Sequence, residues 1–198
     1  MIYSKTTRIH VPAGTEFTAS NGLGSATAST LTLSVPASTA ATSATDVPRL
    51  TIPHNCDPFN IEVIAKLASV SGGDGNTWYR MWICNSSLNT WIFAQANGVA
   101  GTTSLYGTSG FLASGGTLAL DGTGWMRIVV RDGRVSWYFG TGSAGSQDWA
   151  LKWRGEPTFP TSPGSSNYSL IRLDMYQGGG AAGTVTSQWS DVQIMSIK

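Results

Sequence analysis

Aromatic and planar polar side chains alternate with apolar ones along several segments of this chain. Aromatic rings stack on sugar rings, whereas guanidinium, amide and carboxylate groups form directional hydrogen bonds to hydroxyls. These residue types on one surface would therefore suit a glycan. The sequence offers eight candidates for such a surface: Arg80, Trp82, Gln95, Arg127, Tyr138, Arg172, Asp174 and Tyr176.

A protein interface would use the same residue types, because Trp, Tyr and Arg are enriched where proteins meet. The candidate face could thus be covered by the N-terminal segment of the chain or by another subunit. The sequence leaves both the glycan site and the covered interface open.

The spacing of the ionisable residues argues against catalysis. Glycoside hydrolysis needs two carboxyl groups about 5–9.5 Å apart, and the glutamates Glu16, Glu62 and Glu156 are each isolated. Glu62 and Asp174 could form such a carboxylate pair only if they lay on the same face of one sheet. We therefore expect a protein that is not an enzyme.

The remaining reactive residues predict no cofactor and no metal centre. His10 and His54 lack the context of a nucleophile elbow. The Asp74-Gly-Asn segment is better explained as a turn than as a set of calcium ligands. Glycine-rich segments lie between predicted strands rather than before helices, which argues against a nucleotide phosphate site.

Among the predicted elements that carry these candidates, the clearest is a β-hairpin over Trp125–Phe139. Asp132-Gly133 signals a two-residue type I′ turn, which sets Arg131 opposite Arg134 and Arg127 opposite Tyr138. Alternation then gathers apolar residues on one face: Met126, Ile128, Val130, Val135, Trp137 and Phe139.

A second hairpin is predicted from Trp78–Asn85 and Thr90–Ala96. It would place Arg80 near Gln95, Trp82 near Phe93 and Cys84 near Trp91 on one face, and Tyr79, Met81, Ile83, Ile92, Ala94 and Ala96 on the other. Further strands are expected at Thr7–Val11, Thr30–Val35, Phe59–Leu67, Thr117–Leu120, Tyr168–Tyr176 and Val185–Ile197. Short strands at regular spacing predict an antiparallel sandwich or jelly roll.

In this order, the segments resemble the concanavalin A-like (laminin G-like) jelly-roll superfamily. The likeness is carried by Phe59-Asn-Ile-Glu-Val-Ile-Ala, by the two hairpins and by Gln188-Trp-Ser-Asp-Val-Gln-Ile, over about Pro48 to Lys198. The resemblance implies an all-β fold, an antiparallel jelly-roll β-sandwich that binds glycans or proteins on a sheet face or at loop tips. Hydrolytic members carry a Glu-x-Asp-x-x-Glu run, and this chain has none.

Composition separates residues 1–47 from the jelly-roll domain at residues 48–198. The first segment is rich in Ser, Thr and Ala and has few charges and aromatics. It predicts either an arm that packs on a partner or edge strands of the sandwich. Cys56 and Cys84 form either a disulfide or two small buried side chains, and the sequence does not decide between them.

Charge and hydropathy argue against several classes of partner and location. Charged residues make up 12% of the chain and the net charge is +1, which argues against nucleic-acid binding. No apolar run is long enough for membrane insertion, and the N-terminus lacks the apolar core of an export signal.

These observations predict a non-catalytic structural or attachment protein on the surface of a phage or viral particle, of a decoration or fibre type. Its expected partners are capsid or tail proteins, sister subunits in a homo-oligomer, and surface glycans as candidate ligands. The alternative is an extracellular carbohydrate-binding module, and a glycoside hydrolase comes last.

Overall fold

The turn at Asp132-Gly133 forms as predicted and fixes the hairpin around it. In the computed structural model, Asp132 and Gly133 have φ angles of 50° and 78°, and a type I′ turn requires positive φ at both positions. Strands β11 (Gly124–Arg131) and β12 (Arg134–Ser143) pair with Arg131 opposite Arg134. The six apolar residues of the inner face are all buried, which confirms the predicted hairpin.

The structure describes residues 8–13, 16–20, 24–27, 30–42, 47–54, 60–85, 91–156 and 169–197. In these segments the regular elements are all strands. A helix long and apolar enough to cross a membrane is not found in this part of the chain.

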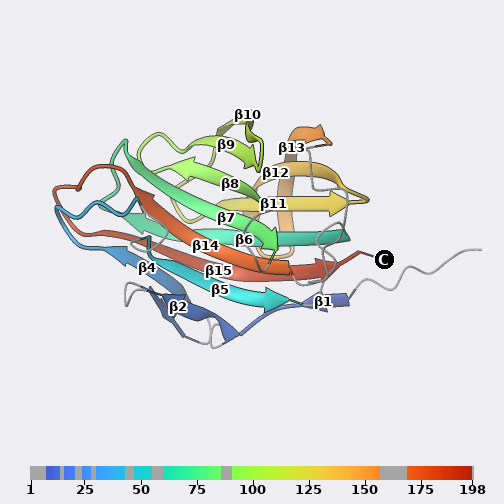
Figure 1. The fold of residues 1–198 in the computed structure, drawn as a ribbon, viewed down its shortest axis with the longest axis horizontal. Helices are drawn as coiled ribbons and strands as arrows, with labels where there is room; N and C mark the ends of the chain where they lie inside the picture. The colour runs from blue at the N-terminus through green and yellow to red at the C-terminus, as the bar shows by residue number, and fades with distance from the viewer. Residues whose placement is uncertain are drawn as a thin grey trace, which may run out of the picture.

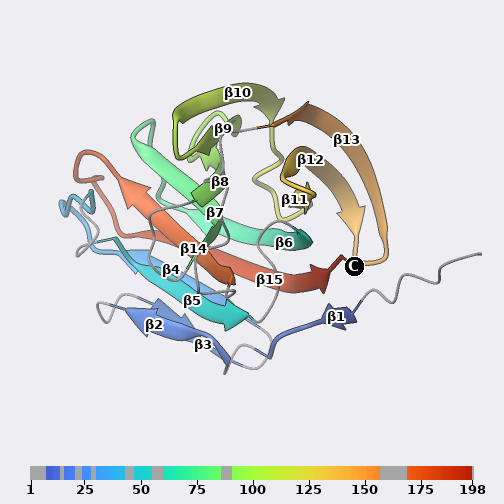
Figure 2. The same ribbon diagram turned by 45° about the vertical axis from the view of Figure 1, so that its right-hand side comes forward.

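Two antiparallel sheets pack against each other (Figures 1 and 2). Sheet 1 has the order β13-β12-β11-β6-β15-β4-β3, and β1 also pairs with β15. Besides the hairpin, its strands are β1 (Arg8–His10), β3 (Gly24–Ala26), β4 (Leu31–Val35), β6 (Asn60–Ser71), β13 (Ser146–Gly155) and β15 (Val185–Ser196).

Sheet 2 has the order β10-β9-β8-β7-β14-β5-β2. Its strands are β2 (Thr18–Ser20), β5 (Arg49–His54), β7 (Thr77–Asn85), β8 (Trp91–Asn97), β9 (Thr102–Gly107), β10 (Gly110–Thr117) and β14 (Ser169–Gln177). The two sheets confirm the predicted antiparallel jelly-roll β-sandwich.

The core lies between the sheets and includes Trp137, Trp189 and Met81, all fully buried. At one edge β10 of sheet 2 comes beside β13 of sheet 1 (Figure 2). Gly115 of β10 lies against the Trp137 ring, where a Cβ atom would come within 2.6 Å of the indole. The missing side chain therefore allows β10 to cover this end of the core.

The strands of the N-terminal segment belong to both sheets. β4 pairs with β15, and Leu31, Leu33 and Val35 enter the common core. β1 also pairs with β15, and β2 pairs with β5. In the strand orders β3 ends sheet 1 and β2 ends sheet 2, whereas β4 lies one strand inside and contributes its apolar residues to the core.

The second hairpin is confirmed in register, with Arg80 opposite Gln95 and Trp82 opposite Phe93. The strand predicted at Thr117–Leu120 is wrong, since β10 ends at Thr117 and the N–H of Leu118 donates instead to the Gly101 carbonyl, 2.8 Å away. The predicted strand starts at Thr7, Phe59, Thr90 and Tyr168 and the loop at 86–89 lie outside the described residues.

Candidate ligand-binding face

The two sheets divide the eight candidate residues between opposite outer faces. Six lie on β7, β8 and β14 of sheet 2: Arg80, Trp82, Gln95, Arg172, Asp174 and Tyr176. Arg127 and Tyr138 lie on β11 and β12 of sheet 1. Because the inner faces of a sandwich meet in the core, its outer faces point in opposite directions. The prediction of one shared surface is therefore wrong.

The same division separates the two carboxylates that a shared face would have joined. Glu62 lies on β6 of sheet 1, between the inward-facing Ile61 and Val63, and so faces outward. Asp174 lies on the outer face of sheet 2, beside Arg80 and Arg172. The core of the sandwich stands between them, and they cannot act together.

An aromatic row crosses four strands on the outer face of sheet 2. The pairing places Phe111 beside Tyr106, Tyr106 beside Phe93, and Phe93 beside Trp82. Phe93 and Tyr106 are stacked with ring centroids 5.1 Å apart, and Phe93 lies 4.0 Å from Trp82. Trp91 joins the row from β8, with its centroid 5.3 Å from that of Phe93.

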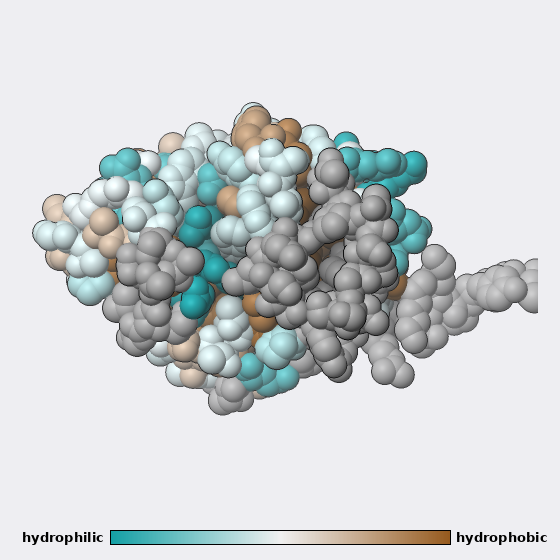
Figure 3. All heavy atoms as spheres, in the orientation of Figure 1, coloured by the Kyte–Doolittle hydropathy of each residue, from teal (hydrophilic) through white to brown (hydrophobic). Residues whose placement is uncertain are grey.

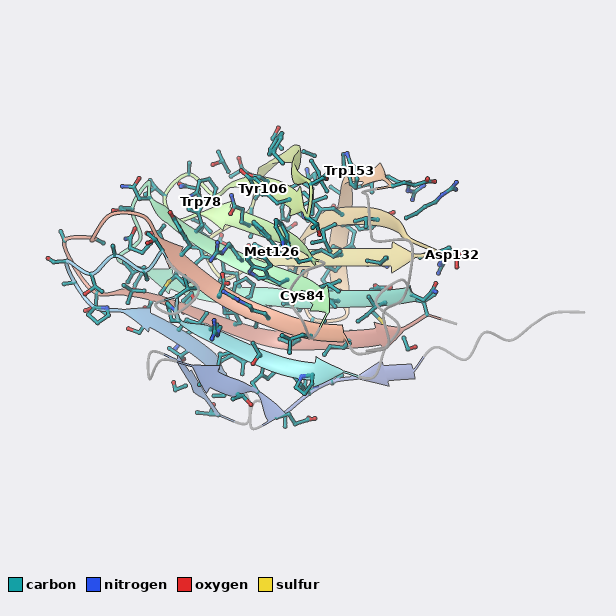
Figure 4. The ribbon with its side chains drawn as sticks, in the orientation of Figure 1. Trp78, Cys84, Tyr106, Met126, Asp132 and Trp153 are labelled. Carbon is teal, nitrogen blue, oxygen red and sulfur yellow. The ribbon has the colours of Figure 1, made fainter. Side chains whose placement is uncertain are left out.

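From Phe93 outward, exposure rises toward the edge of the sheet. Phe93 is buried, Trp82, Trp91 and Tyr106 are half-buried, and Phe111 is 59% exposed. Phe93 thus supports its neighbours, whose ring edges and faces reach the surface. Figure 4 labels Tyr106 on β9 of this sheet, above Cys84 on β7.

Two arginines continue the row and are held in place by a buried carboxylate. The Nε atom of Arg80 lies 2.5 Å from Oδ1 of Asp174, and Nη2 of Arg172 lies 2.6 Å from Oδ2. Both guanidinium groups also lie over the Trp82 ring, 5.2 and 5.1 Å from its centroid, and Arg80 also lies over Tyr176. Asp174 is fully buried, so it fixes the arginines rather than meeting a ligand.

Hydrophilic residues consequently lie among hydrophobic ones on this face, which is turned toward the viewer in Figure 3. Arg80 also pairs in register with Gln95, whose amide is nearly buried. The face therefore combines ring surfaces with a small number of directional donors, which is the usual composition of a ligand site.

Cys84 lies at the far end of the same face and is a free thiol. Its Sγ atom donates to the Leu170 carbonyl, 3.2 Å away. Burial raises the pKa of Cys84 to about 12, so the thiol is protonated and unreactive at neutral pH. Cys56 lies outside the described residues.

A polar network ties the turn before β7 to the end of β14. The Asp74 carboxylate accepts hydrogen bonds from the Asn76 N–H, the Thr77 hydroxyl and the Gln177 amide. Desolvation acts to raise the pKa of Asp74, but these hydrogen bonds outweigh it and lower the pKa below its ordinary value. Within the described residues, no group of three or more His, Cys, Asp or Glu side chains could hold a metal ion.

The sequence reasoning did not include Trp91, Phe93, Tyr106 and Phe111 among the candidates. Trp91 and Phe93 were placed on the correct face by the predicted hairpin. Tyr106 and Phe111 were missed because β9 and β10 are rich in Gly, Ser and Thr and give little alternation of hydropathy. The pair Thr108-Ser109, between Gly107 and Gly110, was the available turn signal.

The chain matches no protein-family model. No curated protein shows significant similarity to it.

Several solved structures share the fold. Their sequence identities to this chain are so low that they show a similar fold and nothing about function. A functionally unknown protein from Saccharomyces cerevisiae aligns with a TM-score of 0.67 at 13% identity, over 94% of this chain and 100% of that one. The carbohydrate-binding module CBM66 from Bacillus subtilis aligns with a TM-score of 0.58 at 8% identity, over 90% and 94%.

A third similar structure is the xylan beta-1,4-xylosidase from Bacillus halodurans C-125, with a TM-score of 0.60 at 12% identity. The match covers 94% of this chain but 38% of the xylosidase, so the chain spans well under half the length of that protein.

The strand order and these neighbours define the class of fold: the chain is an antiparallel β-sandwich, consistent with the concanavalin A-like fold predicted from the sequence. The neighbours that are named for a function are carbohydrate-binding and carbohydrate-cleaving proteins.

Proposed function

We propose that this chain is a non-catalytic glycan-binding domain whose ligand lies along the aromatic row of sheet 2. The observation that carries the proposal is the continuity of Trp82, Phe93, Tyr106 and Phe111 across four neighbouring strands. With strands 4.7–4.9 Å apart, the row extends for about 14 Å. That length suits several sugars of an extended chain better than one sugar.

The arginines supply the specificity that ring stacking lacks. Arg80 and Arg172 are held in place by Asp174, so they lose little side-chain freedom when a ligand binds. Arg80 keeps a side-chain exposure of 13% and can donate to sugar hydroxyls and ring oxygens, whereas Arg172 is buried and supports the face from below. The similarity in fold to a carbohydrate-binding module is consistent with this use of the face.

The absence of catalysis is part of the proposal. In the described strands of sheet 2, Asp174 is the single carboxylate, and both of its oxygens are bound to arginine. Hydrolysis of a glycosidic bond needs a second carboxyl group at a suitable distance. The similarity in fold to a xylosidase therefore does not extend to a paired acid and base on this face.

The test is a glycan array followed by calorimetry on the bound glycans. Tyr106→Ala and Phe111→Ala should each weaken binding about five- to tenfold, because each removes a stacking surface. Leu151→Ala is the matched control, since Leu151 is an apolar residue of sheet 1, 48% exposed. No glycan bound by the native chain, or equal effects of all three variants, would exclude the proposal.

A second candidate is that this face binds protein, as a surface component of a phage or viral particle. The observation that favours it is the large exposed Phe111 beside Tyr106, because aromatic residues are enriched at interfaces. Capsid or tail proteins, or sister subunits, would then cover the aromatic row. Light scattering of the purified chain tests self-association: a homo-oligomer that Phe111→Ala dissociates supports this candidate, and a monomer that does not sediment with particles opposes it.

A further inference from the structure

The outer face of sheet 1 carries an open cleft of about 730 Å³ near the tip of the β11–β12 hairpin. Figure 4 labels Asp132 at that tip, and hydrophilic residues gather beside it in Figure 3. The cleft is lined by Glu62, Arg127, Val129, Arg131, Asp132, Arg134, Ser136, Tyr138, Arg154 and Glu156.

The register of the strands explains the hollow. Val129 and Ser136 face each other across β11 and β12, and both side chains are short. The next outward pair on one side is Arg127 with Tyr138, and on the other side it is Arg131 with Arg134. Two short residues between two pairs of long ones leave a cavity above the sheet. Glu62 of β6 and Arg154 of β13 close its two ends, because they continue the Val129–Ser136 row.

One wall of the cleft is rigid. The Arg127 guanidinium lies 4.9 Å from the centroid of Tyr138 and 5.5 Å from that of Trp149. Its Nε atom lies 2.7 Å from Oε1 of Glu62, in the geometry of an ion pair rather than of a linear hydrogen bond. Arg127 is therefore fixed by two rings and a carboxylate.

The charges of the cleft are not fully balanced. Glu62 neutralises Arg127, and Glu156 neutralises Arg134 at 2.6 Å. Arg131 and Arg154 have no ion pair in the described part of the chain, and the Nε atom of Arg154 donates to the Ser136 hydroxyl. Four arginines against three carboxylates leave one positive charge in excess.

We infer that this cleft binds a glycan that carries a single carboxylate among neutral sugars. Arg131 and Arg154 would bind the carboxylate, since guanidinium groups match its geometry. Glu62 and Glu156 would accept hydrogen bonds from sugar hydroxyls, which a simple anion cannot donate. A polyanion would meet Glu62, Asp132 and Glu156 and be repelled. This site is separate from the proposed site on sheet 2 and stands without it.

The experiment measures binding of two single-acid probes, a xylo-oligosaccharide with one glucuronic acid and sialyllactose. Their controls are the same sugars with the carboxylate converted to a methyl ester, and a heparin fragment as polyanion. At least one acid probe should bind at least tenfold more tightly than its ester and than heparin. Binding should weaken about tenfold in Arg131→Ala and in Arg154→Ala.

Lys152→Ala is the matched control, because Lys152 is on the same strand as Arg154 but outside the cleft. It removes the same charge and should leave binding unchanged. Acid and ester probes that bind equally, acid probes that do not bind, or equal losses in Lys152→Ala and Arg154→Ala would each overturn the inference. Failure of the sheet 2 variants Tyr106→Ala and Phe111→Ala to affect a glycan would not bear on this site.

Discussion

The two outer faces of the sandwich carry the same residue types but differ in shape: one is flat and the other has a cleft. On sheet 2, large rings occupy neighbouring positions on four strands, and the arginines lie flat over Trp82. On sheet 1, the pair Val129 and Ser136 interrupts the long side chains and leaves a cleft. The positions of small residues, more than the composition of a face, therefore determine whether the face is a flat platform or a hollow.

The carboxylates of the two faces also differ in their surroundings. Asp174 is fully buried between two arginines, whereas Glu62 pairs with one arginine and keeps a side-chain exposure of 13%. An unpaired charge costs more where its side chain is fully buried than where it still meets water. The platform should therefore depend on its carboxylate far more than the cleft does.

The largest expected effect comes from Asp174→Asn. It leaves the Arg80 and Arg172 guanidinium groups without their counter-ion, and we expect unfolding free energy to fall by about 3–5 kcal/mol. The matched variant Glu62→Gln should cost about 1 kcal/mol or less. Urea unfolding of both variants measures the difference, and equal losses would remove this contrast between the faces.

Alkaline pH should act on sheet 2, because Tyr79 and Cys84 both lie on β7. Burial raises the pKa of Tyr79 to about 12 from an ordinary 10.0, with a contribution from the Asp74 charge. A raised pKa means that the folded state holds its proton longer, so stability is present below pH 10 and is lost as pH rises toward 12. Between pH 10 and 12, the ionisation of Tyr79 should lower the free energy of unfolding by about 2–3 kcal/mol.

Tyr79→Phe tests this directly. The Tyr79 hydroxyl is buried and has no hydrogen-bond partner among the described residues, so its removal should leave stability at pH 7 unchanged or slightly higher. The same variant should flatten the alkaline loss, and Cys84→Ala should flatten the part that begins near pH 9. If the stability of Tyr79→Phe fell with pH above 10 as steeply as that of the wild type, Tyr79 would not be the group responsible.

Ser136→Phe would fill the cleft of sheet 1 and make this face flat, like the aromatic face of sheet 2. The ring would fill the space above Val129, and a surface substitution of this kind should change stability by about 0.5 kcal/mol. Binding of single-acid glycans should be lost, whereas glycans bound by the aromatic row should bind as before. Calorimetry on both ligands checks this, and intact acid binding would show that the cleft is not the site.

The smallest effect is expected at low pH from the turn that holds the end of sheet 2. Hydrogen bonds lower the pKa of Asp74, so its contribution to stability is present above pH 3.8 and is lost as pH falls further. Asp74→Asn should therefore reduce stability at pH 7 and weaken its dependence on pH in that acidic range. Thermal unfolding from pH 2 to 7 measures both quantities, with Asp148→Asn as a control on sheet 1.

Much of the fold could be predicted from the sequence because hairpins are local. The Asp132-Gly133 turn and the Trp78–Ala96 alternation set which residues pair and which face the core, and both registers are confirmed. The strands β9 and β10 were missed because Gly, Ser and Thr give little contrast in hydropathy. Leu118 was placed in a strand because its hydrophobicity signals burial, and burial does not require a strand.

The candidate site was predicted less well, for a reason that concerns distance along the chain. Each hairpin has an outer face, but local pairing does not say which hairpins share a sheet. β11 pairs with β6, whereas β7 pairs with β14, and both pairings join segments far apart in sequence. Arg127 and Arg80 were therefore assigned correctly as outward-facing and wrongly as neighbours.

Local sequence patterns specified the two central hairpins and the inward or outward direction of their side chains, because a period of two and a two-residue turn are local properties. The tertiary structure alone sets which faces lie back to back, buries Asp174 between Arg80 and Arg172, and makes Val129 and Ser136 the floor of a cleft. Those arrangements follow from long-range strand order and from burial of the whole apolar face, which no single segment contains.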